Sequence, residues 1–189
     1  MRTTLLVTTA ALCLLSACRQ GADDDAMGNT AANSAPVLPV TDNQVGAAPA
    51  GALPAQALAG EDAKRMQHQR HENFERFGKS MKGITRELKG DSPDLAALRK
   101  HASTYTELGP KMLTWFPPGT GPEAGKTGAK AEIWQKPEDF TAKAQAFNQA
   151  ATAFATAAAG QDIAAIRAAH GNLGKSCKAC HDLYREEHH

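Results

Sequence analysis

Apolar residues recur at helical intervals along the second part of the chain. The first such stretch has a large apolar side chain every three or four residues, which is the period of one face of an α-helix. Its members are Phe74, Phe77, Met81, Ile84 and Leu88. Lys89-Gly90 follows the last of them, and a basic residue before a glycine is typical of a helix end. The pattern therefore predicts a long helix that ends near residue 90.

A second amphipathic stretch follows at once. We expect Asp91 or Ser92 to cap its N-terminus, with Pro93 in the first turn, where a missing amide costs no hydrogen bond. Its inner side is apolar: Leu95, Leu98, Ala102, Tyr105 and Met112. A proline- and glycine-rich segment from Trp115 to Lys136 comes next, and we expect no helix in it.

Two further helices complete the pattern. The third is expected to begin at Pro137, and large and small side chains alternate in it as in a coiled-coil seam. The seam consists of Phe140, Phe147 and Phe154 with Ala144, Ala151 and Ala158. The fourth is expected from about Asp162 to Glu187, with inner positions at Ile163, Ile166, Leu173, Cys177, His181 and Tyr184. Four helices and no strand predict an all-α fold, an antiparallel four-helix bundle.

One short motif near the C-terminus contains residues that can bind a cofactor. In Cys177-Lys178-Ala179-Cys180-His181, the two thiols can form thioethers with the vinyl groups of one haem, and the adjacent imidazole can bind its iron. A redox dithiol would require a βαβ context, and zinc would require further ligands at a spacing that the chain does not offer. On a helix, all three side chains project to one face. We therefore predict one covalent haem c, attached through Cys177 and Cys180, in the bundle core.

The N-terminus has the layout of a bacterial secretion signal. Arg2 precedes an apolar stretch from Leu5 to Leu15, and Leu15-Ser16-Ala17-Cys18 resembles a lipobox. We expect residues 1–17 to be removed and Cys18 to carry lipid, with an ordinary signal peptide and an unused Cys18 as the alternative. The protein would then be exported to the periplasm and anchored to a bacterial membrane. Covalent haem attachment of the c type also takes place outside the cytoplasmic membrane, so the two motifs agree.

Composition divides the remaining chain into a tether and a domain. Residues 18–60 are rich in alanine, glycine, asparagine, aspartate and proline and contain no aromatic residue, so we expect a disordered tether. Residues 61–187 are expected to form one domain. The formal net charge of the 189-residue chain is +1, which excludes nucleic-acid binding on electrostatic grounds. Lys175 and Lys178 flank the haem motif and favour an acidic partner.

Several further motifs occur in the order typical of one family. They are Arg70 followed by Phe77-Gly78, the turn Phe116-Pro117-Pro118-Gly119-Thr120, the triplet Glu132-Ile133-Trp134, and the C-terminal segment from Gly174 to Arg185. With the C-terminal position of the haem motif, these residues resemble cytochrome c′, the class II c-type cytochromes, over essentially all of residues 61–187.

The resemblance implies a function for individual residues. His181 is expected to be the sole protein ligand of the iron, with Arg185 beside its imidazole one helical turn further on. Arg70 is expected near the haem edge, with a solvated helix-face charge as the alternative. Phe74 is expected over the open face of the iron, where an apolar lid excludes water and donates no hydrogen bond. Ordinary helix core is the alternative for Phe74.

The implied function is that of a periplasmic monohaem cytochrome that is not an enzyme. Its iron is expected to be five-coordinate, to bind nitric oxide or a similar diatomic gas, and to pass single electrons to periplasmic redox partners. Family members commonly pair through their first two helices, which implies a homodimer. Catalysis is not expected, because Phe74 offers no polar group for proton delivery.

A low-spin electron carrier with a sixth iron ligand is the alternative function. The candidate ligands on the first predicted helix are Met66, Met81 and His71, and both sulfurs lie about two turns from Phe74. The other histidines are expected to face solvent: His68, His101, His170, His188 and His189.

Overall fold

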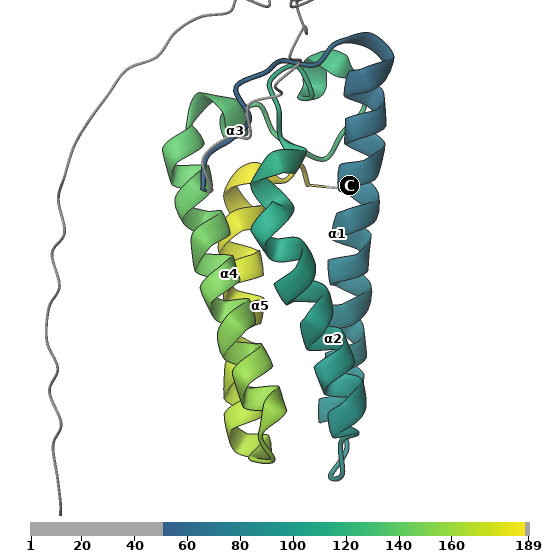
Figure 1. Ribbon diagram of the computed structural model, residues 1–189, viewed down its shortest axis with the longest axis vertical. Coiled ribbons are helices and arrows are strands. Elements are labelled where there is room, and N and C mark those ends of the chain that lie inside the picture. The colour runs from purple at the N-terminus through teal and green to yellow at the C-terminus, as the bar shows by residue number, and fades with distance from the viewer. Residues whose placement is uncertain (1–50, 188–189) are drawn as a thin grey trace, which may run out of the picture. The chain divides into compact units, whose positions relative to one another are not determined.

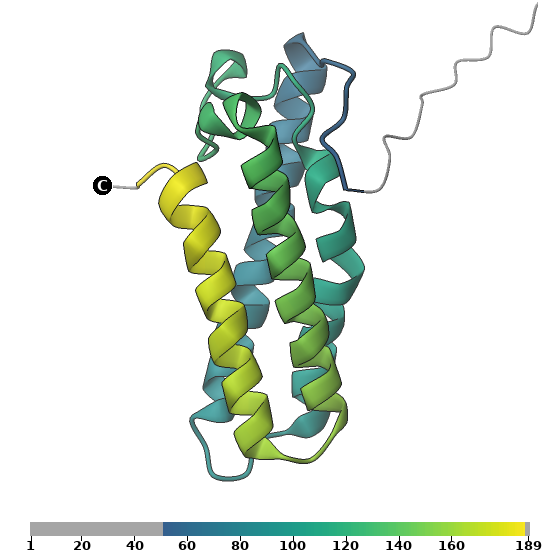
Figure 2. The ribbon, with the colours of Figure 1, turned by 90° about the vertical axis from the view of Figure 1, so that its left-hand side faces the viewer.

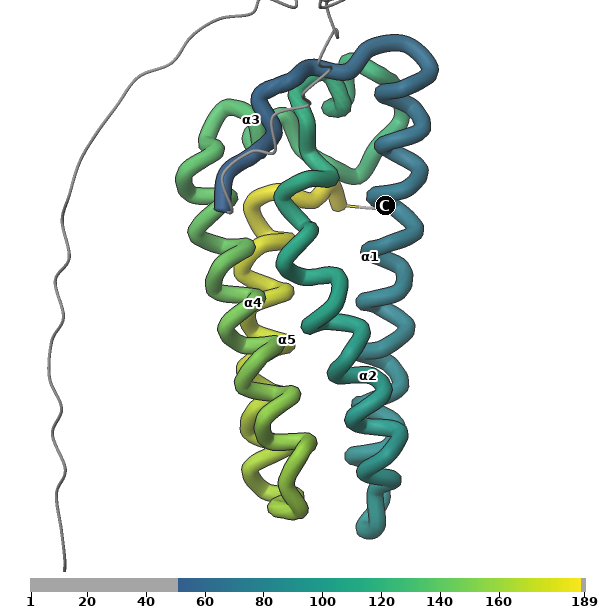
Figure 3. Tube along the Cα trace, viewed as in Figure 1, coloured from purple at the N-terminus to yellow at the C-terminus, as the bar shows by residue number. Residues whose placement is uncertain are grey.

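The computed structural model describes residues 51–187. Within them, four long helices alternate in direction along the chain (Figures 1 and 3). They are α1 (Gly60–Leu88), α2 (Leu95–Leu108), α4 (Pro137–Ala159) and α5 (Ile163–Tyr184). The described residues contain no strand beyond one isolated bridge, so the predicted all-α four-helix bundle is confirmed. None of the helices in this part of the chain is both long and apolar enough to cross a membrane.

The connection between α2 and α4 contains more helix than we expected. A 3₁₀ segment, η1 (Gly109–Trp115), continues from α2, and two short turns follow, η2 (Pro122–Ala124) and α3 (Glu132–Gln135). The prediction of no helix between residues 115 and 136 is therefore wrong for these turns. The indole of Trp134 holds α3 in place by donating to the carbonyl oxygens of Phe116 and Pro117, at 3.1 and 3.2 Å. Because proline disfavours helical geometry in the residue before it, Pro137 separates α3 from α4.

The N-terminal cap of α2 differs from both predicted candidates. Asp94 caps the helix, and its Oδ1 accepts hydrogen bonds from the amides of Ala96 and Ala97 at 2.8 and 3.2 Å. Pro93 therefore precedes the cap instead of lying in the first turn. Asp162 caps α5 in the same way, as the predicted start of that helix requires.

The core is built around the predicted seam of α4. All six seam residues are buried, and the phenyl rings alternate with alanines, so large side chains of neighbouring helices fit between them. The inner side of α2 is also buried at Leu98, Ala102 and Tyr105. Met112 is buried too, but it lies in η1, because the α-helix gives way to 3₁₀ geometry at Gly109.

The predicted boundary between tether and domain at residue 60 lies too late in the chain. The segment from residue 53 to residue 59 packs onto the domain, where Leu53 is half-buried against the core. The amide of Leu58 donates to the carbonyl oxygen of Pro118 at 2.8 Å. In Figure 2 this dark blue segment crosses from the start of α1 towards the upper part of α2. The predicted signal peptide, Cys18 and most of the predicted tether lie outside the described residues.

Candidate functional site

Helix α5 presents the two cysteines to the interior of the bundle. Cys177 and Cys180 are half-buried, pack against the apolar core and are free thiols. Burial raises the pKa of the Cys177 thiol, and burial together with Cys177 raises the pKa of Cys180 to about 11. Both thiols are therefore neutral near pH 7. A pair of uncharged sulfur atoms in an apolar setting suits thioether formation, because the product also carries no charge.

His181 lies directly after the second thiol near the end of α5. Its side chain is more exposed than those of the cysteines, yet partial burial lowers its pKa, and the positive charge of Arg185 lowers it further. Asp182 opposes these effects. The neutral imidazole that results has a free lone pair, which is the form that binds a metal.

Arg185 does not lie on the helix as we expected. Helix α5 ends at Tyr184, and Arg185 is extended and pairs with Ala129 in an antiparallel bridge. The neighbouring amides of Lys130 and Glu186 donate across this junction to Tyr184 and Gly128, at 3.0 and 2.9 Å. Residues 184–186 thus pair with the loop before α3. Arg185 nevertheless stays close enough to His181 to lower its pKa.

A second histidine fixes how α1 faces α5. The Nε2 atom of His170 lies 3.2 Å from Oγ1 of Thr85 and 3.1 Å from the sulfur of Met81. Thr85 donates its hydroxyl proton to the carbonyl oxygen of Met81 at 2.9 Å, so we infer that His170 Nε2 is the donor to Thr85. The prediction that His170 and His101 face solvent is wrong, because both are half-buried, whereas His68 is exposed as predicted. His188 and His189 lie outside the described residues.

Space for a flat cofactor lies further along the same two helices. Helices α1 and α5 are antiparallel, and His170 on α5 contacts Thr85 on α1. The α5 segment that continues from His170 to Cys177 therefore lies beside the α1 segment that leads from Thr85 back to Phe74. Gly78, which is exposed, and Gly174, which is half-buried, lie between these ends, and a Cβ added to either glycine would meet no neighbouring atom within 4 Å, so open space adjoins both. The residues present therefore fit a haem placed between α1 and α5 beside Cys177.

Phe74 forms part of an aromatic cluster at the N-terminal end of the α1 segment that faces α5. Its half-buried ring makes edge-on contacts with Phe77, Trp115 and Phe116, at centroid distances of 5.9, 5.6 and 6.1 Å. Phe77 and Phe116 are purely apolar rings, and Trp115 carries one polar group, its indole N–H. Phe77 in turn stacks on Tyr105 at 5.3 Å. Periodicity indicated that Phe74 faces the interior, but gave no sign of the two aromatic residues from η1 and the loop after it.

Tyr105 is a polar residue near the cysteines to which the sequence gave no function beyond the core. Its hydroxyl donates to the carbonyl oxygen of Phe77 at 2.9 Å, and the residue is almost fully buried. Burial, and secondarily the nearby Cys177, raise the pKa of Tyr105. The hydroxyl therefore stays protonated and fixes Phe77, which contacts Phe74. The only signal in the sequence was its inner position on α2.

Arg70 is buried, with 3% of its surface exposed, so the alternative of a solvated charge is wrong. Its Nη1 donates to the carbonyl oxygen of Trp115 and to Thr120 Oγ1, at 3.2 and 3.1 Å. Its Nη2 donates to the carbonyl oxygen of Thr120 and to Thr127 Oγ1, both at 2.9 Å. The guanidinium also lies 4.7 Å from the ring centre of Phe116. Desolvation lowers the pKa of Arg70 to about 10, which leaves it charged at neutral pH.

The candidate sixth ligands occupy three different settings. Met81 contacts His170, as described above. His71 is exposed, and its Nε2 lies 3.5 Å from the carboxylate of Glu75. Met66 is half-buried against the core. Met81 and His71 thus contact other side chains, whereas Phe74 packs within the aromatic cluster.

Comparison with known proteins identifies relatives over most of the described residues. The family model described as Cytochrome C′ matches residues 65–185. A cytochrome c′ of Cereibacter sphaeroides is 41% identical over 140 residues, which cover 71% of this chain and 91% of that protein.

Solved structures give the same result. One is a cytochrome c′ with an unusual ligand-controlled dimer dissociation, which is 30% identical with a TM-score of 0.63 and covers 68% of this chain and all of its own. Another is the nitric oxide complex of a variant of cytochrome c prime from Alcaligenes xylosoxidans. It is 31% identical with a TM-score of 0.59, and the match covers 70% of this chain and 100% of that chain.

Proposed function

The chain belongs to the cytochrome c′ family, and we propose that it is an exported, lipid-anchored member that binds nitric oxide and passes single electrons. It binds one haem c covalently through Cys177 and Cys180, as the family does through this motif. The haem supplies an iron that can bind a diatomic gas and change its charge by one electron. Residues of the chain decide which of these reactions is favoured.

The proposal of a five-coordinate iron is based on the aromatic side chains around Phe74. A phenyl ring cannot bind the metal or donate a hydrogen bond, and its neighbours Phe77 and Phe116 are also apolar rings, so the indole N–H of Trp115 is the one donor group among the three neighbouring side chains. Such a lid excludes water and gives bound dioxygen no stabilising donor. A small neutral gas needs no donor and can enter when the ring moves. Nitric oxide is the gas we propose, because it is bound in a solved relative.

His181 is the proposed ligand on the opposite face. Its lowered pKa keeps the imidazole neutral, and Arg185 contributes to this effect. We propose that Arg70 lies near the haem edge, where its four hydrogen bonds hold the loop from Trp115 to Thr127. Arg70 would thereby position Trp115 and Phe116, which contact Phe74.

The cellular setting is a proposal that depends on the N-terminal sequence. The lipobox-like Leu15-Ser16-Ala17-Cys18 supports export and a lipid anchor on Cys18, and c-type haem attachment is consistent with a periplasmic site. A homodimer through α1 and α2 is proposed by analogy with the relative whose dimer dissociates under ligand control. Replacement of Cys18 by serine should release the protein from the membrane fraction; retention there would contradict the anchor.

Spectroscopy with and without nitric oxide tests the proposed iron site. We expect a high-spin optical and electron paramagnetic resonance spectrum that changes when the gas is added. Phe74→Ala should speed nitric oxide binding by about tenfold, equivalent to about 1.4 kcal/mol of activation free energy. Phe154→Ala serves as the control, because Phe154 lies on α4 and contacts His170 instead of the Phe74 cluster. A low-spin spectrum that nitric oxide does not change would instead indicate a sixth ligand from α1.

A further inference from the structure

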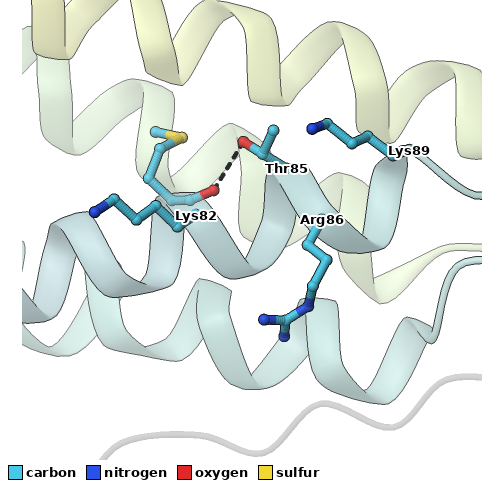
Figure 4. Close-up of a pocket in the computed structure, with 5 residues that line it drawn as sticks. Lys82, Thr85, Arg86 and Lys89 are labelled. Atoms are coloured by element: carbon cyan, nitrogen blue, oxygen red, sulfur yellow. Dashed lines mark hydrogen bonds between the residues drawn. The ribbon is translucent and has the colours of Figure 1, made fainter.

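A shallow groove marks the C-terminal half of α1. It has a volume of about 280 Å³, and five residues line it: Met81, Lys82, Thr85, Arg86 and Lys89. We call it the basic groove. Met81 and Thr85 are half-buried, and the three basic side chains are exposed around them. Figure 4 shows the three cationic groups extending from the helix in different directions. The surface thus combines a small apolar contact with a positively charged rim.

The positive charge of this region is far above that of the whole chain. Residues 76–89 contain five basic side chains and one acidic side chain, whereas the complete chain has a formal net charge of +1. Helix α5 adds Arg167, whose Nη2 donates to the carbonyl oxygens of Leu88 and Gly90 at the end of α1, at 3.2 and 3.1 Å. A local potential of this kind attracts and orients negatively charged partners.

Two of the groove cations have no counter-charge among the residues that the structure describes. Lys79, just before the groove, pairs with Glu75 at 3.1 Å, and Arg86 lies 3.5 Å from Glu87. For Lys82 and Lys89, no carboxylate of residues 51–187 lies within 4.0 Å. Both ammonium groups are exposed and can therefore pair with carboxylates of another molecule.

The basic groove lies close to the cofactor attachment on α5. Its residue Met81 contacts His170, and Cys177 follows His170 by seven positions, which is about 10 Å along a helix. A partner seated on the groove would thus lie beside the α1–α5 gap that fits the haem.

We propose that the basic groove docks an acidic protein that exchanges electrons with the haem. This inference extends the proposed electron-transfer function by naming the docking surface and the charge of the partner. A second copy of the chain seated on the groove itself would bring like charges together, so the homodimer proposed through α1 and α2 would leave the groove exposed. An anionic membrane is also less suited, because the groove is a short concave stretch of one helix, and the same helix carries exposed Glu72 and Glu75 two turns away. Carboxylates around a small apolar contact match the surface best.

The rate of oxidation by ferricyanide tests the local charge. One electron passes from the ferrous haem to ferricyanide, giving ferric haem and ferrocyanide, with no bond made or broken in the protein. At low ionic strength, Lys82→Glu/Lys89→Glu should slow this reaction by about tenfold, and the difference should disappear in high salt. The control is Lys100→Glu/Lys111→Glu, which changes the net charge equally at exposed positions of α2 and η1. Equal slowing by both double variants would overturn the proposal.

Binding of an acidic probe tests the surface without a redox reaction. Fluorescence anisotropy of a labelled oligoglutamate peptide should show salt-sensitive binding to the holoprotein, lost in Lys82→Glu/Lys89→Glu and retained in the control. No difference between the variants would refute the docking site. A second outcome would also refute the docking site: phosphatidylglycerol vesicles bind to the Cys18→Ser protein through these lysines, and the peptide does not bind. Because peptide binding does not depend on the spin state or on nitric oxide, its outcome is separable from that of the gas-binding proposal.

Discussion

The carbonyl oxygen of Leu58 lies well inside the van der Waals distance of the point that a Cβ on Gly119 would occupy. Gly119 has a φ of +80°, a conformation that other residues adopt at a cost. The neighbouring Pro118 accepts the hydrogen bond from the Leu58 amide. The segment before α1 therefore packs against the loop after η1 only because residue 119 has no side chain. This loop also carries Phe116, one of the contacts of Phe74.

We expect Gly119→Ala to lower the free energy of unfolding by about 2–3 kcal/mol. Backbone strain at positive φ contributes about 1–2 kcal/mol, and loss of the Leu58 hydrogen bond contributes about 1 kcal/mol. Urea denaturation gives the value. Gly171→Ala is the control, because a Cβ there meets no neighbouring atom and alanine favours the helix. In a chain that begins at Ala59, the cost of Gly119→Ala should shrink to the strain alone; an unchanged cost would show that Leu58 is not involved.

Asp162→Ala should destabilise the protein by about 1 kcal/mol. The Oδ1 atom of Asp162 accepts from the amides of Ala164 and Ala165 at 2.9 and 3.1 Å, and these amides have no partner within the helix. Asp162→Asn should preserve most of the stability, since the amide oxygen can accept the same bonds. Gln161→Ala is the control, because Gln161 is exposed and directly precedes Asp162. Equal effects at positions 161 and 162 would argue against the cap.

His170 should make the folded state less stable in acid. Burial lowers its pKa in the folded protein below the ordinary value of about 6.5, so the unfolded chain binds the proton more tightly. This penalty is absent above about pH 6.5 and grows as the pH falls through the lower folded-state pKa.

The pH dependence can be assigned with two glutamine variants. The urea midpoint of the wild type should fall between about pH 8 and about pH 5 by more than that of His170→Gln. His68→Gln should keep the wild-type dependence, because His68 is exposed. If His170→Gln retained the full dependence, another group would be responsible.

Phe154→Ala should cost about 3–5 kcal/mol of unfolding free energy, the usual range for a buried phenylalanine. Phe154 is fully buried in the α4 seam, and surrounding helices cannot collapse into the space because Ala151 and Ala158 are already small. Thermal or urea unfolding measures the loss, and Gln149→Ala, at an exposed position of the same helix, is the control. A cost below about 1 kcal/mol would mean that the seam does not govern packing here. The haem spectrum should be unchanged.

Features of the site that depend on local spacing could be predicted from the sequence. Cys177, Cys180 and His181 fall on one part of α5 because helical geometry fixes positions three and four residues apart. The interior position of Phe74 followed from the same period. Arg70 could be assigned only by resemblance, since its partners Trp115, Thr120 and Thr127 are 45 to 57 residues away. The choice of Asp94 over Asp91 or Ser92 as the cap also depended on how the chain turns between residues 89 and 92.

The sequence by itself determined the helical class, the α4 seam and the attachment motif. These follow from residue spacing, which acts within a few turns of one helix. Tertiary structure alone decided that Leu58 packs on the loop at Gly119, that His170 meets Met81, and that Arg185 leaves the helix to pair with Ala129. Each of these contacts joins segments far apart in the chain. Their geometry depends on how whole helices pack, and periodicity within one segment carries no information about that packing.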